Sequence, residues 1–400
     1  ISTLGSHVTG TALPFAAIIT LAATPAQVGL LAALGTLPVL LVGLLAGVLV
    51  DRLRRRPVLI ATDLGRAALL ATVPLAAVLH LLRIELLYVV ALLVGLLTVF
   101  SGIAGEAFLP AVVGRAQLVE GNSQLGASDA LAEIGGPPLG GVLVQWLTAP
   151  IAILFDAVSF LFSAACIALI RTPEQPSKPA ARRPGVAREI IAGLRAVLAN
   201  PLVRPLVAAS ATFNFFGNFI GTLYALYAIR ELRFAPAVVG ALVGLGGIGA
   251  LAGALLVGPI VRRIGLGPAI ISGLAVSGGF SLLIPLAGGP LPLALGMLGV
   301  SQLVGDVWIA IYLIGEASVR QAAIPDAMLG RATASMQVLM QGLAPVGAVL
   351  AGILGSIIGV RPTIFIGVGG ILAAVLWLLV SPIRTLRQAP IAPGGAQETG

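Results

Sequence analysis

The stretch Gly47-Val-Leu-Val-Asp-Arg-Leu-Arg-Arg-Arg-Pro-Val-Leu-Ile-Ala-Thr-Asp-Leu-Gly-Arg66 begins at the end of a long apolar run. It carries one aspartate and four arginines within six residues and then returns at once to apolar sequence. Charges confined to so short a segment between two apolar runs predict a tight turn between two membrane-spanning helices.

The composition agrees with a membrane protein. The 400 residues are 58% hydrophobic and only 10% charged, which is more apolar surface than a soluble core can bury. A helix rises about 1.5 Å per residue and the hydrocarbon layer is roughly 30 Å thick, so each span needs about 20 residues. The apolar runs are too long and too regular for a closed barrel, so the fold class predicted is an all-α integral membrane protein.

Twelve apolar runs have the length of a membrane span. They divide the chain into an N-terminal six-helix half (1–170), a cytoplasmic linker (171–201), a C-terminal six-helix half (202–383) and a cytoplasmic tail (384–400). Within the linker, apolar residues of 186–198 fall on one helical face, which predicts an amphipathic helix on the membrane surface. The predicted spans are 1–22, 28–50, 58–80, 86–108, 123–147, 151–170, 202–228, 237–260, 268–288, 291–315, 332–358 and 362–381.

The positive charges lie in alternate turns. These turns, with the linker, the adjoining Arg204 and the tail, hold 18 of the 23 basic residues, so the positive-inside rule predicts that both termini are cytoplasmic. The net charge of +8 therefore indicates a membrane surface rather than a nucleic acid partner. The single cysteine, Cys166, excludes an internal disulfide. Because the chain begins at Ile1 without a Met, we expect further residues before it, and no cleavable signal peptide is apparent.

The two predicted halves repeat one another. Residues 24–29, Thr-Pro-Ala-Gln-Val-Gly, match residues 235–240, Ala-Pro-Ala-Val-Val-Gly, at an offset of 211. The same offset carries Gly47 onto Gly258, but it carries Asp51 onto Arg262. The match predicts two six-helix repeats in the same orientation.

The spacing of the charged turn, Gly47-x-Leu49-x-Asp51-Arg52-x-x-Arg55-Arg56, resembles the signature loop of the major facilitator superfamily, which joins that family's second and third helices. Here Arg54 stands where the family usually has glycine, and an Asp63-x-x-Arg66 pair follows. The resemblance implies twelve helices in two pseudo-symmetric halves, with a substrate site near the midplane between them. In both departures the chain resembles the branch of the family that exports drugs, macrolides and enterobactin-type siderophores.

A second motif lies in the fifth span. The residues Ala132-x-x-x-Gly136-Pro137-x-x-Gly140-Gly141 resemble the antiporter motif of superfamily exporters, with alanine at the first glycine. Small residues at helical spacing allow close helix approach, and a proline bends the span. The alternative interpretation is ordinary packing between glycine-rich helices.

The resemblance also implies a gating latch. In the family, the loop aspartate meets the start of the eleventh helix and the loop arginine meets an acid below the fourth helix. Carried over to this chain, the latch residues are Asp51, Arg55 and Glu106. The alternative is that these charges only set the topology.

Acidic residues inside the spans are candidates for proton coupling, because burial in the membrane disfavours their charged form. We take Glu133, Asp129 and Asp306 as candidates, each with the alternative of a structural acid that is paired or capped. Asp156 begins the sixth span, where a solvated position at the helix end is expected. His7 is expected to be a packing residue.

The seventh span carries aromatic and amide side chains, which suit large amphipathic or cationic ligands. We expect Asn214, Asn218, Phe215 and Tyr224 to contact the substrate cavity, although helix packing explains some of them equally well.

The sequence contains no Walker loop, zinc-protease motif or nucleophile elbow, so neither ATP hydrolysis nor another enzymatic reaction is predicted. Gly244-x-Gly246-x-x-Gly249 lies inside an apolar span and predicts helix packing rather than dinucleotide binding. No cofactor or metal is expected. The prediction is a monomeric secondary transporter of the cell membrane that exports small amphipathic molecules by proton antiport. A lysolipid flippase, a siderophore exporter and, less favoured, a membrane enzyme or receptor are the alternatives.

Overall fold

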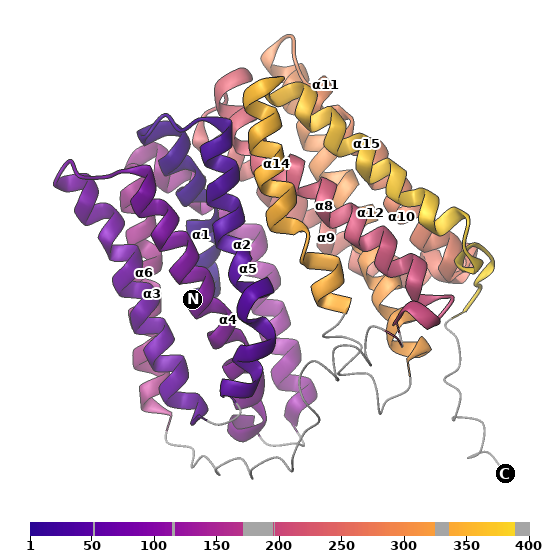
Figure 1. Cartoon of the computed structure of the whole chain (residues 1–400), viewed down its shortest axis with the longest axis horizontal. Helices are drawn as coiled ribbons and strands as arrows, with labels where there is room; N and C mark the ends of the chain where they lie inside the picture. Colours follow the sequence, from indigo (N-terminus) through magenta and orange to yellow (C-terminus); the bar gives the residue numbers. More distant parts are fainter. Residues whose placement is uncertain (51–52, 114–116, 171–194, 196, 325–335, 389–400) are drawn as a thin grey trace. The chain divides into compact units, whose positions relative to one another are not determined.

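A computed structural model gives the structure of the chain and describes residues 1–50, 53–113, 117–170, 195, 197–324 and 336–388 (Figure 1). Helices are the regular elements in these residues, and every predicted span contains one. Their bounds are α1 Ser2–Phe15, η1 Ala16–Thr20, α2 Pro25–Val50, α3 Arg55–Val78, α4 Ile84–Val113, α5 Leu118–Trp146, α6 Ala149–Leu169, α8 Val203–Leu226, η3 Tyr227–Glu231, α9 Pro236–Ile264, α10 Leu266–Ser281, α11 Leu283–Leu286, α12 Leu291–Ala323, α14 Ala344–Ile357, α15 Val360–Leu379 and η4 Pro382–Thr385.

Ten helical segments in the described residues are long and apolar enough to cross a membrane. α1 and α5 are not among them. α1 has only 14 residues before it passes into η1, and α5 carries Glu120, Asp129 and Glu133 along its length. The predicted surface helix at 186–198 falls almost entirely outside the described residues.

The repeat predicted from the sequence is present in the backbone. The π-helical turns η1 and η3 begin at Ala16 and Tyr227, an offset of 211 residues. Each turn is followed by a residue with positive φ, Ala22 (51°) and Arg233 (57°), at the same offset. π-turns are rare in proteins, so their presence at equivalent points of both halves indicates a structural repeat.

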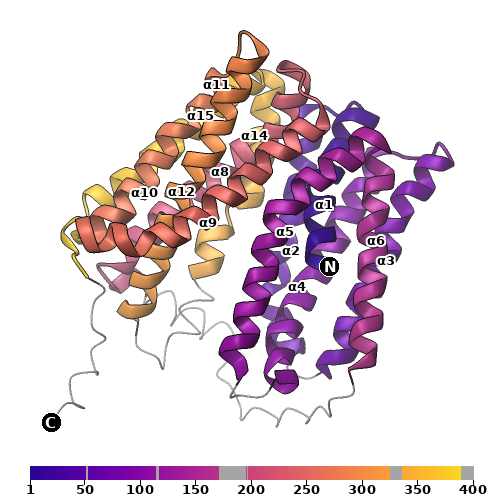
Figure 2. The same cartoon turned by 180° about the vertical axis from the view of Figure 1, so that it is seen from behind.

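The described chain forms two compact units. Unit 1 comprises 1–181, 222–244 and 348–360, and unit 2 comprises 182–221, 245–347 and 361–400. In unit 1, α3 packs on α4 and α6, α2 on α4, and α1 on α5 and α6 (Figure 2). In unit 2, α10 packs on α12 around the buried ring of Tyr312, whose hydroxyl lies 2.7 Å from Ser210 Oγ.

Close helix contacts depend on glycine. Gly273 on α10 faces the backbone of α12, where an added Cβ would lie 2.8 Å from Tyr312 N. In membranes, small residues of this kind let helices associate by backbone contact. The glycine-rich composition of the spans therefore serves helix packing.

Candidate functional site

Unit 1 contains a buried charge cluster formed by Asp63, Arg66 and Asp156. The solvent-exposed fractions of these three residues are 2%, 7% and 1%, respectively. α3 supplies Asp63 and Arg66, which lie eight and eleven residues after its first residue, or about 12 and 17 Å along the helix. α6 supplies Asp156, seven residues after its start. The cluster therefore lies deep within both helices.

Arg66 is held by three different contacts. Its Nη2 atom forms an ion pair with Asp63 Oδ1 and also donates to Ser101 Oγ (2.9 Å) on α4. Its guanidinium carbon lies 4.1 Å from the centre of the Phe160 ring on α6. A guanidinium over an aromatic face is attracted by the ring quadrupole. Arg66 thus joins α3, α4 and α6.

Asp156 has a different environment from Asp63. The Ser159 hydroxyl lies 3.1 Å from Asp156 Oδ1, and Thr9 on α1 approaches the same carboxyl group. A Cβ added at Gly5 would meet Asp156 Oδ1 and Ser159 Oγ, so the backbone of α1 covers the carboxylate directly. The expectation that Asp156 is solvated at a helix end was wrong, because α1 seals the position.

Polar atoms without a partner remain inside the cluster. Asp63 Oδ2 and Arg66 Nε are buried, and neither has a hydrogen-bond partner among the described residues. Buried polar atoms are normally hydrogen-bonded, so unsatisfied ones point to a proton, a water molecule or another ligand at the site.

The predicted antiporter motif of α5 makes contacts on two sides. A Cβ at Gly136 would meet His7 on α1, and a Cβ at Gly140 would lie 3.1 Å from Val8 O. On the other side, Cβ positions at Gly141 and at Gly240 of α9 would meet each other's helix backbone. The glycines therefore place α5 between α1 and α9, and His7 is a packing residue as expected.

A second contact in unit 1 repeats this one. A Cβ at Gly352 on α14 would lie 2.9 Å from Gly29 Cα on α2. Gly29 and Gly240 are 211 residues apart, and so are Gly141 and Gly352. The polar contacts repeat as well: Ala26 N donates to Ser356 Oγ (3.0 Å), and Ala237 N donates to Gln145 Oε1 (3.2 Å). We call these two glycine contacts the paired contacts. Each joins a helix of the first repeat to a helix of the second.

Glu133 and Asp129 lie outside these contacts. Both residues are exposed on unit 1. The reason is the rotation of α5: Ala132, Gly136 and Gly140 are buried, which turns the two acids away from α1. Their role in proton coupling stays a prediction, because exposure on unit 1 does not test it.

Asp306 in unit 2 points toward α9. A Cβ at Gly246 would meet Asp306 Oδ2, and a Cβ at Gly249 would lie 3.3 Å from Asp306 Cβ. Gly246 and Gly249 therefore accommodate α12, and a Cβ at Gly244 would meet Pro138 of α5, so the glycines that match a dinucleotide fingerprint serve helix packing.

The predicted latch is described only in part. Asp51 lies outside the described residues. Glu106 is exposed, and no ion pair joins it to Arg55 within the described part of the chain. The neighbouring Arg56 donates to Ile167 O (3.1 Å) at the end of α6. The latch remains a prediction.

The aromatic face of α8 is largely packed. Phe215 forms ring contacts with Phe216 and Phe219, at centroid distances of 5.0 and 5.7 Å. Asn218 donates to Asn214 O (2.7 Å) and Asn214 donates to Ser210 O (2.8 Å), so each amide is held by its own helix. The side chains of Asn214, Phe215 and Asn218 are half-buried, and that of Tyr224, which belongs to unit 1, is buried.

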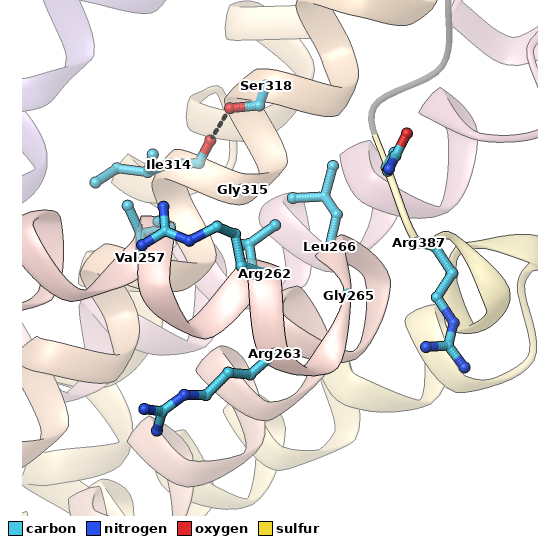
Figure 3. A pocket seen from close by; sticks show the side chains of 12 residues that line it. Val257, Arg262, Arg263, Gly265, Leu266, Ile314, Gly315, Ser318 and Arg387 are labelled. Atoms are coloured by element: carbon cyan, nitrogen blue, oxygen red, sulfur yellow. Dashed lines mark hydrogen bonds between the residues drawn. The ribbon is translucent and has the colours of Figure 1, made fainter.

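A basic pocket of about 560 Å³ opens in unit 2 where α9 meets α10. Its cationic residues are Arg262 and Arg263 at the end of α9 and Arg387 after η4. Figure 3 shows these arginines on two sides of Leu266. Ser318, on the wall formed by α12, donates to Ile314 O (2.8 Å). We call this cavity the basic pocket.

The sequence indicated only the part of the charge cluster that lies on α3. An arginine in the middle of an apolar span is a strong signal of function, because isolated charges are unfavourable in the membrane. Its near partner Asp63 is one turn away. Asp156 and Gly5 belong to distant segments, and a single sequence gives no sign that they meet.

Known proteins are similar to this chain over most of its length. The family described as transmembrane secretion effector, MFS_3, matches residues 1–396. The chain is 29% identical over 337 residues to the multidrug efflux pump Tap of Mycolicibacterium fortuitum, which covers 82% of this chain and 80% of Tap. It is 27% identical over 376 residues to the enterobactin exporter EntS of Citrobacter koseri, which covers 92% of this chain and 87% of EntS.

Solved structures show the same fold. The nucleoside transporter NupG (D323A mutant) superposes with a TM-score of 0.78 over 94% of this chain and 97% of NupG, at 13% identity. A bacterial homologue of the iron transporter ferroportin gives a TM-score of 0.73 over 94% of this chain and 96% of that protein, at 17% identity. These structures show that the chain has the major facilitator fold. The matched family is one of transporters rather than enzymes. The chain therefore belongs to the transmembrane secretion effector family of major facilitator transporters.

Proposed function

We propose that the chain is a secondary active transporter that exports small amphipathic molecules in exchange for protons. The observation that supports this most directly is the paired contacts of unit 1. They consist of glycine backbones and one hydrogen bond each, so they can separate without exposing a charge. Contacts of that kind suit two repeats that move past each other during alternating access.

The substrate class is supported by the relatives. Tap is a multidrug efflux pump and EntS is an enterobactin exporter. We propose that Asn214, Asn218, Phe215 and Tyr224 contribute the amide and aromatic groups that meet an amphipathic substrate. Candidates for the proton-coupling group are Glu133, Asp129 and Asp306.

The proposal includes an orientation and a division of labour. Both termini and the linker 171–201 lie in the cytoplasm, and the chain works as a monomer in the cell membrane. The six-helix halves 1–170 and 202–383 rock about a central site. Asp51, Arg55 and Glu106 latch one of the two end states.

Efflux of ethidium tests this function. Cells that lack their own efflux pumps are loaded with ethidium, and its loss is followed with and without a protonophore. We expect expression of the chain to speed the loss, and the protonophore to abolish the gain. Glu133→Gln, Asp129→Asn and Asp306→Asn are compared in the same assay. An equal rate of ethidium loss with and without the protonophore would refute proton coupling.

Siderophore export is the second candidate, because EntS matches almost the whole chain. If ethidium does not move, export of enterobactin is measured in cells that synthesise it and lack their own exporter. Restored export would place the chain with EntS in substrate choice. Movement of fluorescent lysolipid between leaflets of proteoliposomes, with neither dye nor siderophore transported, would identify a flippase instead.

A further inference from the structure

The charge cluster of unit 1 is not electrically balanced. Asp63 and Asp156 provide two negative charges, and Arg66 provides one positive charge. The elements packed around the cluster add no second cation at this depth. The helices around the cluster carry other charged or titratable residues. They are His7 on α1, which contacts α5, Arg55 and Arg56 in the first turn of α3, Glu85, Tyr88 and Glu106 on α4, the exposed Glu120, Asp129 and Glu133 on α5, and Cys166 near the end of α6.

The two carboxylates have partners of different kinds. Asp63 is paired with a guanidinium, which favours the ionised form. The Ser159 hydroxyl is the hydrogen-bond partner of the Asp156 carboxyl group, and Thr9 and Arg66 lie near the same group. A hydroxyl can donate or accept, so Ser159 satisfies Asp156 with or without a proton. One proton on Asp156 also makes the whole cluster neutral.

We propose that Asp156 holds the proton that this transporter exchanges for its substrate, while Arg66 keeps Asp63 ionised beside it. The inference rests on the proposed proton antiport. In the exchange, the O–H bond of the Asp156 carboxylic acid breaks, the proton passes to water, and the carboxylate remains beside Arg66. The reverse step reloads the site.

The packing of α1 links this site to the paired contacts. α1 closes over Asp156 at Gly5, and it contacts α5 at Gly136 and Gly140. α5 in turn contacts α9 at Gly141. When that contact opens, α5 shifts and α1 shifts with it, which uncovers Asp156. The helix movement that accompanies substrate transport would therefore also expose Asp156 for proton release.

Proton release by the purified protein tests the proposal. The detergent-solubilised chain is placed in weakly buffered solution with a pH-indicator dye, and ethidium is added as the probe. We expect the wild type to release a proton on binding ethidium, Asp156→Asn to bind ethidium without release, and Asp156→Glu to restore release. Glu120→Gln, which removes an exposed acid in the first turn of α5, serves as the matched control that keeps it.

A second variant guards against misfolding of Asp156→Asn. Asp63→Asn keeps Asp156 but leaves one carboxylate for Arg66, so the cluster is neutral without a proton and release should again be lost. Release at the wild-type level by Asp156→Asn or by Asp63→Asn would overturn the assignment. A wild type that transports ethidium but releases no proton would overturn proton antiport itself, and the two failures are therefore distinguishable.

The basic pocket carries a second inference from separate observations. Arg262, Arg263 and Arg387 are exposed, and no ion pair or hydrogen bond engages their side chains in the described part of the chain. The pocket lining contains no acid. Arg387 is held in place because Leu266 N donates to Arg387 O (3.1 Å) and Gly267 N donates to Leu386 O (2.7 Å).

Apart from Ser318 and Gln388, the remaining side chains of the pocket lining are apolar. Val257, Val261, Leu266 and Ile314 line it, and Leu255 on the adjoining turn of α9 is 73% exposed. Basic pockets between membrane helices bind anionic lipid head groups, and an apolar wall accommodates the attached glycerol and acyl carbons. We infer that the basic pocket binds the head group of an anionic phospholipid.

Native mass spectrometry tests this with short-chain phosphatidylglycerol as the probe and phosphatidylcholine and inorganic phosphate as comparisons. We expect retained phosphatidylglycerol on the wild type, and its loss in the triple variant Arg262→Gln/Arg263→Gln/Arg387→Gln. Arg384→Gln is the matched control, since Arg384 is exposed nearby but does not line the pocket. Equal retention of phosphatidylcholine, or binding of phosphate in place of the lipid, would overturn the inference.

Discussion

Replacing Arg66 with methionine tests how strongly the charge cluster depends on its cation. The substitution keeps an unbranched side chain but removes the ion pair with Asp63, the hydrogen bond to Ser101 and the contact with Phe160. Removing one partner of a buried ion pair costs about 3–5 kcal/mol, because the other charge stays buried. Two carboxylates remain here, so we expect a loss of about 5 kcal/mol in the free energy of unfolding.

A double-mutant cycle separates this loss from simple loss of packing. Asp63→Asn leaves Arg66 with Asp156 and should cost only about 1–2 kcal/mol, the value of a hydrogen bond. In Arg66→Met/Asp63→Asn, one carboxylate remains and a single proton neutralises it. The double variant should therefore be more stable than the sum of the single losses predicts, by about 2 kcal/mol.

The assay is equilibrium unfolding in mixed micelles of dodecyl maltoside and dodecyl sulfate, followed by circular dichroism. An Arg66→Met loss below about 1 kcal/mol, together with additive effects in the cycle, would refute the view that Arg66 neutralises buried charge.

Two further predictions concern helix contacts. Gly140→Leu places a side chain against Val8 O, so it should destabilise the fold by about 1–3 kcal/mol and abolish ethidium efflux. The control is Gly135→Ala, whose Cβ would come no closer than 3.9 Å to Leu4. This control should change neither the stability nor the efflux. In a Cys166→Ser background, Ala26→Cys/Ser356→Cys should form a disulfide on oxidation, because these residues are in hydrogen-bond contact. Oxidation should stop efflux and a reductant should restore it, whereas efflux by a fully cross-linked protein would show that this contact need not open.

The helices could be predicted from the sequence because lipid imposes a simple rule. A run of about 20 apolar residues must form a helix to satisfy its backbone, so the spans from 58–80 and 237–260 correspond to α3 and α9 with only shifted ends. The offset of 211 was also visible, since Pro25 and Pro236 begin equivalent helices.

The site could not be predicted to the same depth. Which face of a lipid-embedded helix is buried depends on its neighbours, and hydropathy is similar all around α5. Glu133 is therefore exposed although its sequence position lies close to the glycine row. Asp156 is buried because Gly5, about 150 residues earlier, brings α1 against it. Pairings between distant segments are properties of the packed structure, and no local pattern encodes them.

The π-turns η1 and η3 say something about how the gene arose. A π-turn corresponds to one residue added within a helix, and here it occupies the same point in both repeats. The simplest history places that added residue in a six-helix ancestor, before its gene was duplicated and fused. The offset of 211 still holds at Gln145 and Ser356. Since the fusion, the two copies have therefore kept the same net number of residues between Ala16 and Gln145 and between Tyr227 and Ser356.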